Sequence, residues 1–146
     1  VLQNSPRGQP AATPESQPSQ TLKILVAEDT AVNQLLIKKL LGRWDHNFKI
    51  VENGRLAVEA YREQAFDLIL MDVQMPEMDG LAAARTIREA EREKGSHIPI
   101  IALTARAFEA DRQECIQAGM DDVLVKPFSF DDLSKLLADV ASGAYG

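Results

Sequence analysis

Five short apolar runs alternate with five amphipathic stretches along most of the chain. The runs are rich in Val, Ile and Leu and are bounded by turn residues, which is typical of buried strands. The strands are expected at residues 22–27, 48–51, 66–71, 98–103 and 123–125. The third run is apolar at nearly every position, which indicates a strand covered on both faces, as in a parallel sheet.

The stretches between the runs repeat apolar residues at helical spacing. Helices are expected at residues 30–41, 54–63, 81–94 and 107–118, and a last one begins near residue 130. Thr30 is expected to cap the first helix, which carries Val32, Leu36 and Leu40 along one face.

The order of these elements predicts a single α/β domain. A strand followed by a helix recurs five times at spacings of about 20–25 residues, a span typical of βαβ units. Right-handed crossovers place such strands in a parallel sheet with helices on both faces. The fold class that follows is a flavodoxin-like (βα)5 three-layer sandwich, with a parallel sheet of order 2-1-3-4-5.

The N-terminal stretch differs from the rest in composition. Residues 1–21 are rich in Pro, Ser, Gln and Ala, and we expect them to form a disordered linker. Residues 22–142 are expected to form the domain, and residues 143–146 a short tail. Because the first residue is Val1, we expect the segment to come from a longer protein in which the linker tethers this domain.

Charge, hydropathy and cysteine content narrow the classes of function. The formal net charge is −6 with no basic run, which argues against binding of nucleic acid or anionic membranes. No apolar stretch approaches the roughly 20 residues of a membrane span. The single cysteine, Cys115, excludes an internal disulfide and fits a reducing compartment. We therefore expect a cytoplasmic domain without direct membrane contact, whether or not its parent protein is membrane-anchored.

Polar side chains stand where four of the predicted strands end. They are Glu28 and Asp29 after the first strand, Asp72 after the third, Thr104 after the fourth and Lys126 after the fifth. Ligands of open parallel sheets bind outside the carboxyl ends of the strands, where the strand order reverses. The sequence therefore predicts that these residues share one site.

The three carboxylates of this set indicate a metal site. Charges of like sign about 4 Å apart repel by about 4 kcal/mol at an effective dielectric constant near 20. Such a cluster either raises a pKa or holds a divalent cation, and oxygen ligands suit Mg²⁺ or Mn²⁺ better than Zn²⁺. Taken alone, Glu28 and Asp29 would indicate capping of the first helix, because acids are favoured at helix N-termini. Together with Asp72 at the end of the neighbouring strand, they favour metal binding.

Asp72, together with Thr104 and Lys126, also suits phosphoryl chemistry. A carboxylate such as Asp72 beside Mg²⁺ can act as a nucleophile, although a lone strand-end Asp commonly forms an Asx turn. The Lys126 ammonium can pair with a phosphoryl oxygen or, before modification, with Asp72. The Thr104 hydroxyl can donate to an acyl phosphate or cap the following helix.

Several segments in this order resemble the receiver domain of two-component response regulators, over residues 22–141. They read ILVAED at 24–29, DVQMPEMDG at 72–80, ALTA at 102–105, AGMDD at 118–122 and KPF at 126–128. The stretch EDTAVNQ at 28–34 is similar to receivers that are fused to sensor histidine kinases.

The resemblance implies a phosphoacceptor in a phosphorelay. Asp72 would receive a phosphoryl group from a phosphohistidine of a histidine kinase or a histidine phosphotransfer domain. Asp29, Asp72 and the backbone carbonyl of Gln74 would bind Mg²⁺ directly, and Glu28 would act through water.

The resemblance also implies how the phosphoryl group is held and sensed. Thr104 and Lys126 would contact it, and the bond between Lys126 and Pro127 would be cis. Receivers usually carry an aromatic side chain or His three residues before the lysine, where this chain has Val123. We therefore expect switching through the loop and helix after Thr104.

Other interpretations stay open. The domain is either the C-terminal receiver of a hybrid histidine kinase, which we favour, or a stand-alone receiver. We expect the segment itself to accept a phosphoryl group rather than to turn over a substrate, and a hybrid parent would be the enzyme. A phosphohydrolase with an aspartyl nucleophile usually has a second Asp two residues on, where this chain has Gln74. The intact Asp72, Thr104 and Lys126 disfavour an interaction module that has lost the chemistry.

Overall fold

A five-stranded parallel sheet with helices on both faces forms the described part of the chain, residues 21–43, 46–106 and 108–145 of this computed structural model. Apart from residue 21, the expected linker at residues 1–21 lies outside the described residues. The strands are β1 (Lys23–Ala27), β2 (Asn47–Val51), β3 (Leu68–Asp72), β4 (Ile100–Thr104) and β5 (Asp122–Val125). The helices are α1 (Ala31–Gly42), α2 (Gly54–Glu63), α3 (Gly80–Lys94), α4 (Glu109–Gln117) and α5 (Phe130–Ala141).

The strand order is β2-β1-β3-β4-β5, as the sequence predicts, and all neighbouring strands are parallel. The register pairs Ala27 at the end of β1 with Met71, and Asp72 at the end of β3 with Leu103. The carboxyl ends of the central strands therefore lie level with one another at one edge of the sheet.

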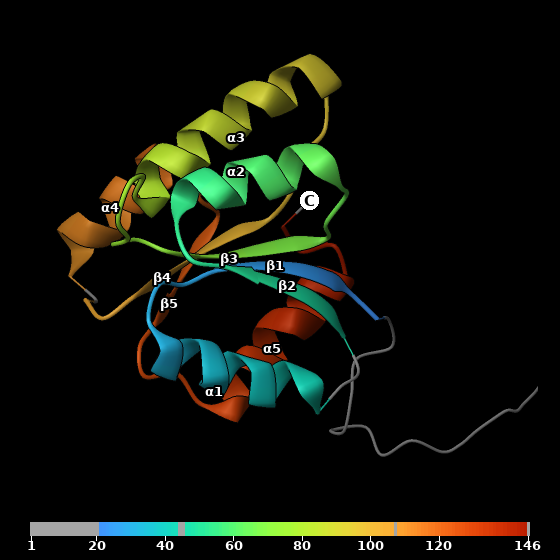
Figure 1. The fold of residues 1–146 in the computed structure, drawn as a ribbon, viewed down its shortest axis with the longest axis vertical. Coiled ribbons are helices and arrows are strands. Elements are labelled where there is room, and N and C mark those ends of the chain that lie inside the picture. Colours follow the sequence, from blue (N-terminus) through green and yellow to red (C-terminus); the bar gives the residue numbers. More distant parts are fainter. Residues whose placement is uncertain (1–20, 44–45, 107, 146) are drawn as a thin grey trace, which may run out of the picture.

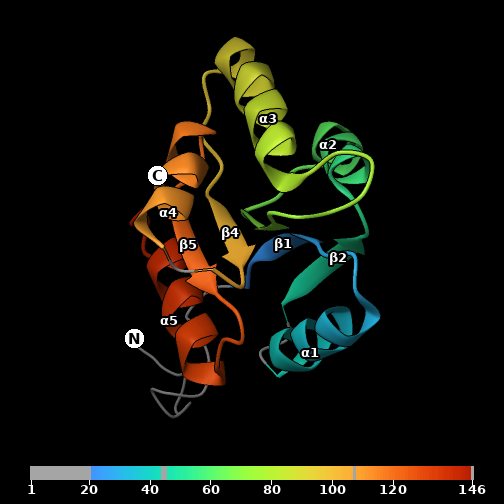
Figure 2. The same ribbon diagram turned by 90° about the vertical axis from the view of Figure 1, so that its left-hand side faces the viewer.

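The helices form two layers, with α2, α3 and α4 on one face of the sheet and α1 and α5 on the other (Figures 1 and 2). Along β3 the side chains alternate between two cores, as the period of a strand requires. Ile69 and Met71 pack under the first layer, and Leu68 and Leu70 pack under the second. Because β3 is buried on both faces, its sequence is apolar up to Asp72.

The face of α1 that packs on the sheet differs from the expected one. Ile37, Leu40 and Leu41 are its buried residues, whereas Val32 is 79% exposed and Leu36 is 38% exposed. The expected face is therefore wrong at its first two positions. The helix has apolar residues on several sides, and contact with the sheet buries one of these sides and leaves another in solvent.

The other element boundaries agree with the sequence to within two residues. β4, for example, begins at Ile100 rather than at residue 98, and β3 extends to Asp72 itself. Every helix within the described ranges is too short or too polar to cross a membrane.

Candidate functional site

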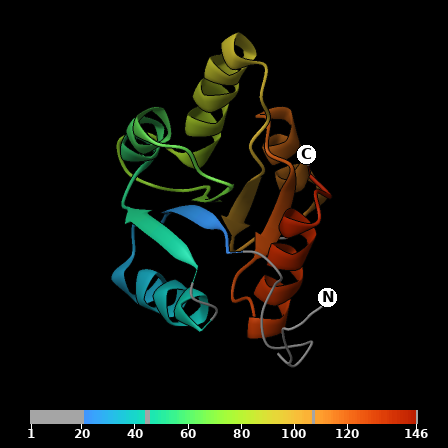
Figure 3. The ribbon, with the colours of Figure 1, turned by 90° about the vertical axis from the view of Figure 1, so that its right-hand side faces the viewer.

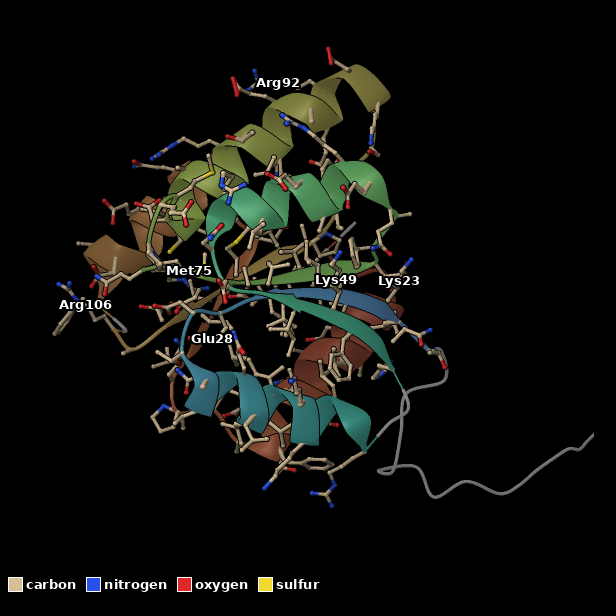
Figure 4. The ribbon with its side chains drawn as sticks, viewed as in Figure 1. Lys23, Glu28, Lys49, Met75, Arg92 and Arg106 are labelled. Carbon is tan, nitrogen blue, oxygen red and sulfur yellow. The ribbon has the colours of Figure 1, made fainter. Side chains whose placement is uncertain are left out.

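The carboxyl ends of β1, β3, β4 and β5 surround a cleft of about 340 Å³. Figure 4 labels Glu28, Met75 and Arg106 at this end of the sheet and Lys23 at the other end. The cleft is lined by all of the residues that the sequence placed in one site, namely Glu28, Asp29, Asp72, Gln74, Thr104 and Lys126. The structure thus brings together side chains that are up to 98 positions apart in the chain.

Three carboxylates form an acidic cluster in the cleft. Glu28, Asp29 and Asp72 each offer an oxygen atom, and these atoms lie within 4.8 Å of one another. Glu28 is fully buried, Asp72 is 7% exposed and Asp29 is open to solvent. An all-oxygen donor set that is buried on one side and hydrated on the other fits Mg²⁺, which usually keeps several of its water ligands.

Lys126 lies directly against this cluster. Its Nζ atom is 2.9 Å from Oε1 of Glu28 and 3.2 Å from Oδ2 of Asp72. Burial alone would lower the pKa of Lys126, but the hydrogen bond with Glu28 and the charge of Asp72 leave that pKa raised. The lysine is therefore a cation that compensates two of the three acids. The peptide bond between Lys126 and Pro127 is cis, as the resemblance implies.

Glu28 is held by the start of α1. Its Oε2 atom accepts hydrogen bonds from the Thr30 N–H at 3.1 Å, from the Thr30 hydroxyl at 2.8 Å and from the Asn33 amide at 3.4 Å. Burial raises the pKa of Glu28, but the bonds from Lys126 and Thr30 outweigh this effect and lower it overall. Glu28 is consequently an ionised anchor for the lysine.

The expected role of Thr30 needs a correction. Thr30 stands at the N-cap position of α1, but its side chain makes no cap hydrogen bond. Its hydroxyl donates to the buried carboxylate of Glu28 instead, because an ionised group in the interior must be hydrogen-bonded. Asn33 and Gln34 belong to the stretch at 28–34 that resembles kinase-fused receivers, but they were not expected at the site. Both contact Glu28, and the Gln34 amide donates to the Glu28 carbonyl at 2.6 Å. The sequence carries a signal for these contacts, because two amide side chains stand in the first turn of the helix that follows the acidic pair.

Asp72 is in a different electrostatic state. Burial, followed by the charge of Glu28, raises the pKa of Asp72 to about 6, and Lys126 offsets only part of the shift. The Gln74 N–H donates to Oδ1 of Asp72 at 3.4 Å, so the side chain forms an Asx-like turn and also belongs to the cluster. A carboxylate with a raised pKa is more basic than an ordinary Asp, which suits a nucleophile.

Thr104 lines the cleft at the end of β4. Its Oγ1 atom accepts a hydrogen bond from the Arg106 N–H at 3.1 Å, which orients the hydroxyl at the start of the loop that leads to α4. The proton of this hydroxyl remains available to donate toward the cleft, because the bond to Arg106 uses an oxygen lone pair.

The loop between β3 and α3 is fixed by two glycines. A Cβ atom on Gly80 would lie 2.2 Å from the carbonyl oxygen of Asp72, and one on Gly54 would lie 2.3 Å from that of Met78. Backbone hydrogen bonds run from Gly80 to Val73 and from Gly54 to Met78, both at 2.9 Å. These close approaches, which only glycine permits, hold the backbone around Asp72 in place.

The proteins to which this chain is similar are receiver domains and histidine kinases. The model of the response regulator receiver domain family matches residues 24–138. Hybrid signal transduction histidine kinase I of Dictyostelium discoideum is 43% identical over 123 residues, which cover 81% of this chain and 7% of that protein. Sensor protein GacS of Pseudomonas syringae pv. syringae is 44% identical over 121 residues, which cover 82% of this chain and 13% of that protein. The chain thus spans only a small part of these relatives.

Solved structures show the same architecture. The receiver domain of a sensor histidine kinase from Pseudomonas aeruginosa, with a magnesium ion coordinated in its active-site cleft, has a TM-score of 0.77 and 40% identity, covering 85% of this chain and all of that one. The receiver domain of the Saccharomyces cerevisiae response regulator Ssk1, crystallised with the histidine phosphotransfer protein Ypd1, has a TM-score of 0.81 and 29% identity. That match covers 86% of this chain and 92% of the other. With the strand order, the acidic cleft and the family match in agreement, this chain belongs to the response regulator receiver domain family.

Proposed function

We propose that Asp72 is the phosphoacceptor of a phosphorelay. The observation that carries the proposal is the position of Asp72 between the other carboxylates of the cleft and Lys126. A carboxylate oxygen of Asp72 attacks the phosphorus atom of a phosphohistidine. A P–O bond then forms, the P–N bond breaks and the imidazole nitrogen keeps the electron pair. The product is an aspartyl phosphate on this chain and a free histidine on the partner.

Two side chains would stabilise the transferred group. The ammonium of Lys126, now 3.2 Å from Asp72, would pair with a phosphoryl oxygen, while its bond to Glu28 keeps it at the cleft. The hydroxyl of Thr104 would donate to a second phosphoryl oxygen, which pulls the loop after β4 toward the cleft. This movement is the proposed switch.

The acidic cluster fits a magnesium ion. Asp29, Asp72 and the backbone carbonyl of Gln74 would hold it directly, and Glu28 would act through water. When bound, Mg²⁺ neutralises negative charge on the transferring group and on the acids around it. Mn²⁺, which accepts the same oxygen ligands, is the alternative ion.

The partner surface lies beside the cleft on α1. Val32 and Leu35 are 79% and 55% exposed, and both are large apolar side chains on one helix. The same helix lines a mostly apolar groove of about 310 Å³ through Leu36, and Pro127 and Phe128 line it together with Glu28 and Lys126 of the cleft. A histidine-bearing partner has to approach this rim to reach the phosphoacceptor, so we propose that a histidine phosphotransfer domain or kinase covers it. The complex of Ssk1 with Ypd1 supports this class of partner.

The wider context is a further part of the proposal. The relatives that are 43% and 44% identical are histidine kinases, which favours a hybrid kinase as the parent protein over a stand-alone receiver. Residues 22–142 would then form the receiver unit, joined to the kinase through residues 1–21. A cytoplasmic location fits the free, buried thiol of Cys115.

The test is phosphorylation of the chain by acetyl phosphate with Mg²⁺, followed by intact-mass measurement. We expect one added phosphoryl group on the wild type and none on Asp72→Asn. Asp131→Asn, at an exposed position in the first turn of α5, is the matched control and should be labelled as the wild type is. Labelling that persists in Asp72→Asn would refute the assignment of the phosphoacceptor.

The proposed partner surface gives a separate prediction. Leu35→Ala should lower the rate of phosphotransfer from a phosphorylated Ypd1 about 5- to 30-fold, the range expected when one interface anchor is truncated. Its rate with acetyl phosphate should not change, because Leu35 is exposed and is not among the cleft residues. Ile116→Ala, which truncates a 40% exposed apolar side chain on α4, serves as the control. Equal transfer to both variants would show that α1 is not the docking surface.

A further inference from the structure

α4 is the most weakly anchored of the helices in the described residues. Cys115 is its one buried residue, whereas each other helix buries at least three. Phe108, at its N-cap position, makes no side-chain cap bond and is 69% exposed. Few apolar contacts hold this helix, so individual polar contacts carry more weight in positioning it.

One carboxylate links α4 to the turn that follows α5. Oδ1 of Asp122, the first residue of β5, is 3.2 Å from Nη2 of Arg112 on α4. Oδ2 of the same carboxylate accepts a hydrogen bond of 2.8 Å from the hydroxyl of Tyr145. The Val123 N–H also donates to Oδ1, at 2.8 Å. Helix and turn therefore share the two oxygens of one side chain.

The backbone of the turn after α5 places Tyr145 next to this carboxylate. Gly143 has a φ of +86°, and its N–H donates to the Val140 carbonyl, while the Ala144 N–H donates to the Asp139 carbonyl. The chain consequently turns after α5, a helix that lies along the edge of the sheet formed by β5 (Figures 2 and 3). Tyr145 packs against the core under α1 and α5. Burial, and then the bond to Asp122, raise the pKa of Tyr145 to about 12.

We propose that the turn after α5 restrains α4 through Asp122. Tyr145 fixes the carboxylate in the orientation that Arg112 requires, so the position of the turn and the position of α4 depend on each other. For the phosphorylated chain the inference rests on the proposed function. If the loop after Thr104 moves toward the cleft, α4 follows, and Arg112 is drawn away from Asp122. Coupling of this kind is reciprocal, so a change in the turn must also bias α4.

The test on the unmodified chain is hydrogen exchange in α4. Tyr145→Phe removes one hydroxyl group and should speed exchange at residues 109–117 about two- to fivefold, the effect of losing a hydrogen bond of ordinary strength. Arg112→Gln should have a similar effect. The double variant should exceed the larger single effect only slightly, because both act through Asp122. Tyr61→Phe, which removes the other tyrosine hydroxyl of the chain, should leave α4 unchanged.

A second variant changes the turn without changing a side chain that binds Asp122. Gly143→Ala places a side chain at a left-handed backbone position that is open to solvent, so it alters the turn through its backbone alone. It should speed exchange in α4 as Tyr145→Phe does. Unchanged exchange in α4 for both variants, or fully additive effects of Tyr145→Phe and Arg112→Gln, would overturn the proposal.

Phosphorylation provides the third measurement. At a limiting concentration of acetyl phosphate, Tyr145→Phe should raise the ratio of phosphorylated to free chain about two- to fivefold, because α4 is freed to move. An unchanged ratio would contradict the role of the turn in switching. A wild-type chain that takes up no phosphoryl group would refute the proposed function instead, and the exchange measurements would still decide whether the turn restrains α4.

Discussion

Gly80→Ala is expected to lower the free energy of unfolding by about 2–4 kcal/mol, because overpacking against rigid backbone cannot relax cheaply. The new Cβ atom would lie 2.2 Å from the carbonyl oxygen of Asp72 and 3.0 Å from Cγ of Met71. Relief requires the end of β3 or the start of α3 to move. Either movement shifts Asp72 relative to Lys126, so we also expect phosphorylation by acetyl phosphate to slow about tenfold or more.

Urea unfolding and the rate of labelling measure the two effects of Gly80→Ala. Gly42→Ala is the matched control, because a Cβ atom at Gly42 meets nothing within 4 Å. Gly42 is the last residue of α1, so its replacement should leave stability unchanged or raise it by up to about 1 kcal/mol. If Gly80→Ala unfolded at the same urea concentration as the wild type, the close packing of this loop would not be a constraint.

Asp72→Asn is expected to stabilise the fold while it abolishes phosphorylation. Without a metal ion, Lys126 compensates two of the three acids of the cleft, and Asp72 is ionised against the charge of Glu28. Removing this charge should raise the free energy of unfolding by about 1–3 kcal/mol above pH 7, which is about what a pKa displaced by two units represents. Chemical unfolding in the presence of a chelator measures the gain.

The gain should depend on pH with a definite sign. Because the pKa of Asp72 is raised to about 6 in the folded chain, the folded state binds its proton more tightly than the unfolded state does. The penalty is therefore complete above pH 6 and disappears as the pH falls toward the ordinary value of an Asp. Burial lowers the pKa of His46, which gives a slope of opposite sign, so the difference between the two proteins is the quantity to follow. A difference that stays constant from pH 4 to pH 7.5 would contradict the raised pKa.

Local signals were sufficient to predict the architecture. Each strand is an apolar run with turn residues on both sides. β3 shows the continuous apolar pattern of a strand that is covered on both faces. Once the strand order is known, the positions of Glu28, Asp72, Thr104 and Lys126 at strand ends imply that they meet. The cleft confirms this convergence. Their chemical roles remain predictions.

The features that escaped prediction depend on tertiary contacts. α1 has apolar residues on more than one side, so its sequence cannot show that Ile37 faces the sheet and Val32 faces solvent. The hydroxyl of Thr30 binds Glu28 because that carboxylate is fully buried, and burial is a property of the assembled fold. Tyr145 and Asp122 are 23 positions apart with no local pattern that joins them.

The contact between Lys126 and Glu28 has a consequence for how the domain assembles. β5 is an edge strand, and the lysine that follows it pairs with Glu28, the residue that follows β1. Two strands, β3 and β4, lie between β1 and β5. Fraying of this edge would withdraw the cation and leave the carboxylates of Glu28 and Asp72 facing one another in the cleft. No fragment that ends before residue 126 can reproduce the electrostatic balance of the cleft. The docking of β5 and the formation of the acidic cleft are therefore coupled, because the residue after this edge strand carries the positive charge that compensates Glu28 and Asp72.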